Sequence, residues 1–101
     1  MRMIMQDFIP NEAFNAAVKD GTAGAKMQKI IAEQKPEAVY FTEFHGQRSG
    51  ILSVDLKAAS EIPKFAEPWI LTFNARVELH PAMTPQDLGA AGLEALGKQW
   101  A

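Results

Sequence analysis

Arg76-Val77-Glu78-Leu79-His80 alternates charged or titratable residues with aliphatic ones. Side chains of a β-strand point alternately to the two faces of its sheet, so this alternation predicts a strand. Val77 and Leu79 would face the core, while Arg76, Glu78 and His80 would share the opposite face. The stretch therefore predicts a sheet with one apolar face and one face that carries ionisable groups.

Composition is that of an ordinary globular protein, with 48% hydrophobic and 22% charged residues. The length predicts one domain over residues 1–101. A net charge of −2 without a Lys/Arg block argues against a nucleic-acid partner. Without cysteine there is no disulfide, thiol catalysis or thiolate metal site. No signal peptide is expected, and no apolar run approaches the ~20 residues of a membrane span, so we expect a cytoplasmic protein without a membrane partner.

Local signals divide the rest of the chain into strands and helices. Further strands are predicted at residues 3–9, 38–44 and 51–56, with residues 45–50 as a turn between the last two. Helices are predicted to follow the caps Asn11, Ser60 and Thr84. Because glycines interrupt residues 20–24, the first helix should be kinked or split. The last helix is apolar and glycine-rich, so it should need a surface on which to dock.

The order β-α-β-β-α-β plus a terminal helix predicts an α+β protein of the ferredoxin-like plan, with a four-stranded antiparallel sheet. Both main helices would cover one face of that sheet. The residues expected beneath them are Val39, Phe41, Leu52, Val54, Leu56, Val77 and Leu79.

The other sheet face would combine aromatic and charged side chains. Its expected members are Ile4, Gln6, Phe8, Tyr40, Thr42, Phe44, Ile51, Ser53, Asp55, Arg76, Glu78 and His80. Such a face is too apolar for water and too charged for a core. A homodimer that pairs two of these faces around a partly polar cavity satisfies both conditions, and two-fold pairing is the commonest closure. An unidentified small molecule would occupy the cavity.

Four segments also resemble those of a known superfamily. They are Lys35-Pro36-Glu37-Ala38-Val39-Tyr40-Phe41, Glu67-Pro68-Trp69, Asn74-Ala75-Arg76-Val77-Glu78 and Met83-Thr84-Pro85-Gln86-Asp87-Leu88. Across the chain, the sequence is similar to small, uncharacterised bacterial proteins of the dimeric α/β-barrel superfamily. The resemblance implies two ferredoxin-like protomers paired by their sheets. Members include muconolactone isomerases, cofactor-free monooxygenases, haem-degrading enzymes and stress-induced proteins, so it implies no single reaction.

Three residues are candidates for catalysis. His80 could act as general acid or base, because an imidazole exchanges protons near neutral pH. Glu78 could orient its ring, although the two residues lie roughly 6.5 Å apart along a strand; Asp55 or Tyr40 across the sheet could serve instead. Arg76 could hold a substrate carboxylate, or could simply pair with an acid. His80 could equally do no more than end a strand at the barrel rim.

Tyr40, Thr42 and Asp55 are candidates for substrate binding as walls of the cavity, or else polar residues of an interface. The only other histidine, His45, lies in a turn, so no metal site or other cofactor is predicted. The function hypothesis is a small isomerase or cofactor-independent monooxygenase. The alternative is a non-catalytic ligand-binding or stress-associated homodimer, and RNA stacking on Tyr40 and Phe44 is a third hypothesis that the acidic balance disfavours.

Overall fold

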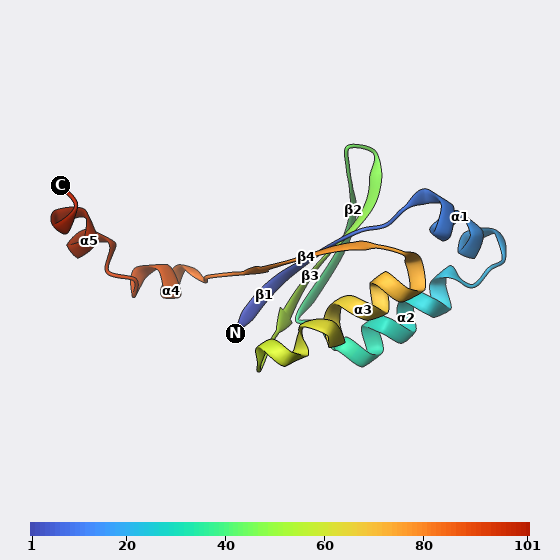
Figure 1. Ribbon diagram of the computed structural model, residues 1–101, viewed down its shortest axis with the longest axis horizontal. Helices are drawn as coiled ribbons and strands as arrows, with labels where there is room; N and C mark the ends of the chain where they lie inside the picture. Colours follow the sequence, from blue (N-terminus) through green and yellow to red (C-terminus); the bar gives the residue numbers. More distant parts are fainter.

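The computed structural model covers residues 1–101 and contains four strands and five α-helices (Figure 1). The strands are β1 (Arg2–Phe8), β2 (Ala38–Phe44), β3 (Gln47–Asp55) and β4 (Arg76–Pro81). The helices are α1 (Asn11–Lys19), α2 (Ala23–Gln34), the 3₁₀ turn η1 (Ala59–Glu61), α3 (Ile62–Phe73), α4 (Pro85–Gly89) and α5 (Leu93–Gln99).

The strands form one antiparallel sheet in the order β2-β3-β1-β4. The predicted α+β class and four-stranded antiparallel sheet are therefore confirmed. The order fits the split-βαβ plan, because β3 inserts between β1 and β2 while β4 joins the free side of β1. Helices α2 and α3 run side by side along one face of the sheet (Figure 1). None of the helices α1, α2 and α3 covers the opposite face of the sheet, which is called the uncovered face below.

The hairpin between β2 and β3 is tighter than predicted. Its loop contains only His45 and Gly46, whose φ angles are +53° and +76°. Two consecutive residues with positive φ form the type I′ turn whose twist matches that of paired strands. The prediction of a turn over residues 45–50 was wrong, because Gln47 and its successors pair with β2 and extend β3 by four residues.

The predicted break in the first helix is present in the structure, but two of the three predicted N-caps are not. The predicted split is present: α1 and α2 are separate helices on either side of Gly21, which has a φ of +80°. Neither Asn11 nor Ser60 supplies the predicted cap, since their helices begin without a side-chain cap hydrogen bond. Thr84 does form its capping box with Asp87.

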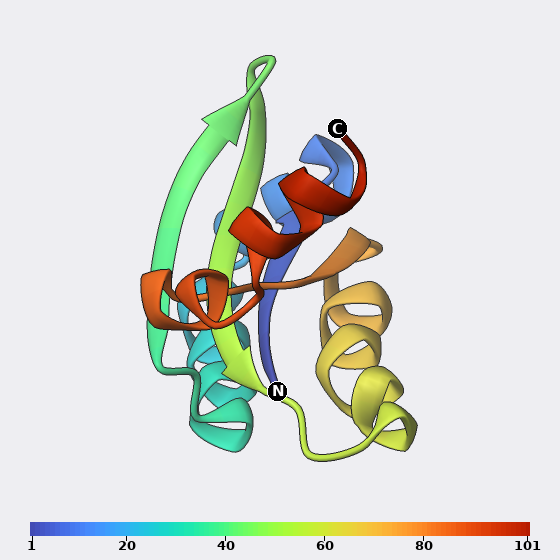
Figure 2. The same ribbon diagram turned by 90° about the vertical axis from the view of Figure 1, so that its left-hand side faces the viewer.

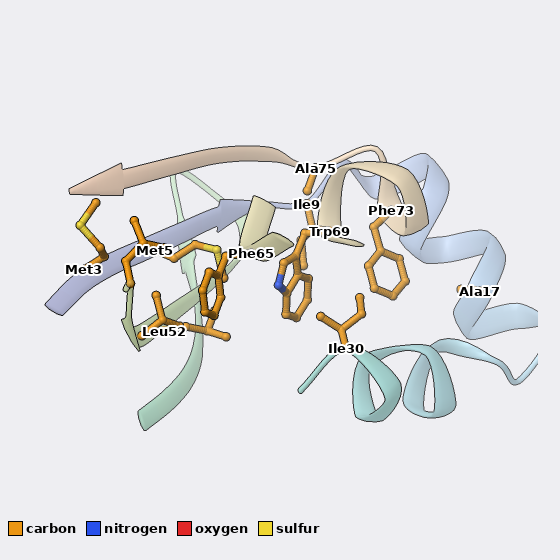
Figure 3. Close-up of a cluster of buried hydrophobic side chains, with 12 residues drawn as sticks. Met3, Met5, Ile9, Ala17, Ile30, Leu52, Phe65, Trp69, Phe73 and Ala75 are labelled. Atoms are coloured by element: carbon orange, nitrogen blue, oxygen red, sulfur yellow. The ribbon is translucent and has the colours of Figure 1, made fainter. Parts of the chain in front are cut away.

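The core lies between the sheet and the helices (Figure 3). Trp69 and Phe73 of α3 are fully buried there, near Ile30 of α2, and the buried Leu52 of β3 lies beside Phe65. The indole N–H of Trp69 donates to the side-chain oxygen of Gln34 at 3.1 Å, which satisfies the one polar group of that ring. Most residues predicted beneath the helices are buried or half-buried, but Phe41 is 48% exposed, because the β2–β3 hairpin extends past the helix layer.

The chain beyond β4 forms an arm, residues 83–101, that contains α4 and α5 (Figure 1). The prediction of one terminal helix was wrong: two short helices are separated at Gly92, whose φ is +75°. No residue from Pro85 onward is buried. None of the helices in the structure combines the length and the apolar character that crossing a membrane requires.

Candidate functional site

Strand register places the candidate residues on the face that the helices leave uncovered. Across β1 and β4, Phe8 pairs with Arg76 and Ile4 pairs with His80, with Glu78 midway between. The buried residues of β1, such as Met5, alternate with these positions and face the helices. The predicted assignment of the two sheet faces is confirmed for all four strands.

Arg76, Glu78 and His80 form one chain of contacts along β4. The Glu78 carboxylate accepts a hydrogen bond from the Arg76 guanidinium with one oxygen, and its other oxygen lies 3.2 Å from His80 Nε2. Both contacts, Arg76 first, lower the pKa of Glu78 below that of an ordinary glutamate. Glu78 therefore stays ionised near neutral pH and can orient the His80 ring, in spite of the spacing along the strand.

An aromatic ring also contacts the guanidinium of Arg76. Its guanidinium carbon lies 3.9 Å from the centroid of the Phe8 ring, within the range of a cation–π contact. Phe8 in turn packs against Phe44 at a centroid distance of 6.1 Å. The predicted alternative in which Arg76 pairs with an acid is thus realised, yet its other N–H donors remain free, since the side chain is 62% exposed.

The contact with Glu78 defines which nitrogen of His80 could react. A carboxylate only accepts hydrogen bonds, so the neutral ring carries its proton on Nε2, the nitrogen that faces Glu78. Nδ1 is then the basic nitrogen and forms no hydrogen bond with the protein. This is the arrangement of an oriented general base. An acid that orients the base and a nearby guanidinium complete a set of groups able to move a proton on an anionic substrate.

Asp55 and Tyr40 do not orient His80, so those two suggestions were wrong. Asp55 binds the Lys57 amine and, at 3.0 Å, the N-terminal ammonium, and these contacts, Lys57 first, lower its pKa to about 2. Tyr40 lies on β2, three strands from β4, or about 14 Å at the usual strand spacing. Tyr40, Thr42 and Asp55 do share the uncovered face, but they are not clustered with His80.

A charged groove of about 780 Å³ lies where the uncovered face meets the arm. Its lining residues are Met1, Arg2, Glu37, Asp55, Pro81, Ala82, Met83 and Asp87. Arg2 lines the groove and donates two hydrogen bonds to the Glu37 carboxylate, at 2.8 and 3.3 Å. Its charges are already paired, which favours a structural role for the groove at the base of the arm.

Sequence reasoning missed Asp7, the one acid in the core. Asp7 is fully buried on the helix side of β1, and neither carboxylate oxygen has a hydrogen-bond partner. Desolvation raises its pKa from 3.8 to about 7. A signal was present, because Asp7 alternates with Gln6 and Phe8 and so had to share the face of Met3 and Met5.

No group of three or more His, Asp or Glu side chains is placed to hold a metal ion. A comparison of the sequence with protein-family models finds no match, and neither does a comparison with curated proteins. The resemblance to dimeric α/β barrels therefore stays a prediction. The uncovered face, with its row of ionisable groups, is the candidate functional site.

Proposed function

We propose that this protein is a homodimeric, ferredoxin-like α/β barrel that binds a small anionic molecule between two paired sheets and moves a proton on it. The observation that carries the proposal is the contact chain from Arg76 through Glu78 to His80 on a sheet face that no helix covers. An isomerase, or a monooxygenase that works without a cofactor, needs such an oriented base and an anion-binding group.

The composition of the uncovered face supports pairing with a second copy. Tyr40 is 67% exposed and Phe44 is 37% exposed, although large aromatic side chains of this kind gain from burial. Pairing two such faces would bury the aromatic residues and would exclude water from the row that ends at His80. In a drier site the attraction between Arg76 and a substrate anion is stronger.

In the proposed reaction His80 Nδ1 takes a proton from a carbon or oxygen of the substrate, while Glu78 stabilises the imidazolium that forms. Return of that proton to another substrate atom completes an isomerisation. Arg76 binds the substrate's carboxylate or enolate through the donors that Glu78 leaves free. The cation–π contact with Phe8 supports the position of the guanidinium.

Sedimentation velocity tests the dimer and its face. The wild-type chain should sediment as a dimer, and Arg76→Glu should shift it towards monomer because it places like charges beside Glu78. Lys19→Glu, on the exposed end of α1, is the matched control and should leave the dimer unchanged. An unshifted Arg76→Glu dimer would exclude this face, provided circular dichroism shows that the variant is folded.

Native mass spectrometry of the purified protein tests the ligand and the chemistry. A small acid should copurify with the wild type and be lost from Arg76→Gln. Incubated with the recovered compound, the wild type should convert it, and His80→Gln should not. A ligand that binds and is never converted would instead support the non-catalytic ligand-binding homodimer.

A further inference from the structure

The arm gives the protomer a shape that a single folded chain of this size does not usually have. The Cα radius of gyration is 17.0 Å, whereas a compact domain of this length has about 13 Å. The long axis measures 59 Å against 29 and 19 Å for the other two. Figure 1 shows that α4 and α5 account for this length, because they project beyond the end of the sheet. Figure 2 is viewed from that end, and the two helices lie nearest the viewer there.

The direction of the arm is fixed by hydrogen bonds at its base. The Ala82 N–H donates to the Arg2 carbonyl at 3.0 Å, which prolongs the pairing of β4 with β1 by one residue. The capping box follows at once: the Thr84 side chain accepts from the Asp87 N–H at 3.1 Å, and the Asp87 carboxylate accepts from the Thr84 N–H at 2.9 Å. The arm therefore leaves the body as a structured continuation of the edge strand.

The second helix of the arm has an apolar side with nothing packed on it. Leu93 and Leu96 of α5, and Trp100, which caps its C-terminal end, recur at positions i, i+3 and i+7 and so lie towards one side of the helix. Their exposed fractions are 58%, 44% and 79%. The opposite side carries an i,i+4 ion pair, Glu94 with Lys98, at 3.8 Å. This amphipathic pattern is typical of a helix that lies on an apolar surface.

The area of the uncovered sheet face indicates which surface α5 would pack on. Four strands at about 4.8 Å spacing and seven residues at about 3.3 Å each cover roughly 440 Å². Stable interfaces bury about 800 Å² of accessible surface on each partner, and a flat footprint of this size is well below that area. The arm brings leucines and a tryptophan to the same edge of the molecule, and their burial would provide the remainder.

We propose that the arm, residues 83–101, is exchanged between two copies of this chain, so that α5 of each copy packs its Leu93–Leu96–Trp100 side on the partner. This inference rests on the proposed homodimer. It adds that the barrel is incomplete without the arms. The arm begins three residues after His80, so an exchanged arm closes the end of the cavity at which the proposed base lies.

Trp100 is a natural reporter of this exchange, because the only other tryptophan, Trp69, is fully buried. Acrylamide quenching of the full chain, measured across dilution alongside sedimentation, should find Trp100 protected in the dimer and quenchable in the monomer. Trp100→Phe supplies the signal of Trp69 alone. The double variant Leu93→Ser, Leu96→Ser should raise the dimer dissociation constant at least tenfold.

Leu71→Ser is the matched control: Leu71 is as exposed as Trp100 but lies on α3, outside the arm, so the dissociation constant should not change. A dimer in which Trp100 stays quenchable, and which the double variant leaves intact, would overturn the exchange and leave the proposed function standing. Protection of Trp100 in the monomer would show that the arm folds on its own body and would also overturn it. A chain that never dimerises would overturn both proposals.

Discussion

Replacing Asp7 with asparagine should remove most of the loss of stability that the wild type undergoes as pH rises from 5 to 8. Burial without a hydrogen-bond partner raises the pKa of Asp7 from 3.8 to about 7. Each pKa unit corresponds to about 1.4 kcal/mol, so ionising Asp7 in the folded protein costs about 4 kcal/mol. The unfolded chain releases this proton near pH 4 and the folded protein holds it up to about pH 7.

This difference in proton binding sets the direction in which the free energy of unfolding changes with pH. Between pH 4 and 7 the folded state binds more protons than the unfolded state, so the free energy of unfolding falls as pH rises, and above pH 7 the loss is complete. From pH 5 to 8 this one group should lower it by roughly 2.5 kcal/mol. That is a decrease of roughly 1–2 M in the urea midpoint.

Urea titrations at pH 5 and pH 8, followed by circular dichroism, measure this decrease. Wild type and Glu67→Gln, a matched change at an exposed carboxylate, should both show it, and Asp7→Asn should not. Equal pH dependence in Asp7→Asn and wild type would refute the reasoning, because it would mean that Asp7 is solvated or paired in the folded protein.

Two further substitutions test how the core and the hairpin are held. Gln34→Leu should lower the free energy of unfolding by about 1–3 kcal/mol in urea titrations, because the buried indole N–H of Trp69 loses its acceptor; an unchanged midpoint would contradict that role. Gly46→Ala should cost about 1–2 kcal/mol in thermal unfolding, since Gly46 has a φ of +76°. Gly89→Ala, in α4 with open space around it, is the control and should not be destabilised.

The alternation of residues in the strands predicted the sheet faces correctly. Because side chains alternate strictly along a strand, Val77 and Leu79 on one face placed Arg76 and His80 on the other, as the register confirms. The break after α1 was equally predictable, since glycine at residue 21 tolerates the positive φ that ends a helix turn.

Features that depend on tertiary contacts could not be predicted from the same sequence. The predicted caps at Asn11 and Ser60 were wrong, because the chain enters both helices through other residues. The contact between Glu78 and His80 depends on side-chain rotamers that spacing along the strand does not determine. The terminal segment was predicted to dock, but its apolar residues have no surface within the protomer that would select one continuous helix.

A distance between spin labels tests the central claim, the pairing of two uncovered faces, most directly. The chain contains no cysteine, so Ser53→Cys introduces a single label site on that face, in the row that contains Ile4 and His80. Sheets that pack face to face lie about 10 Å apart, so two labels at residue 53 should be within roughly 25 Å of each other. Labels on Glu67→Cys, in the helix layer, should lie beyond roughly 30 Å. A shorter distance for Glu67→Cys than for Ser53→Cys, or no dipolar coupling at residue 53, would contradict the account.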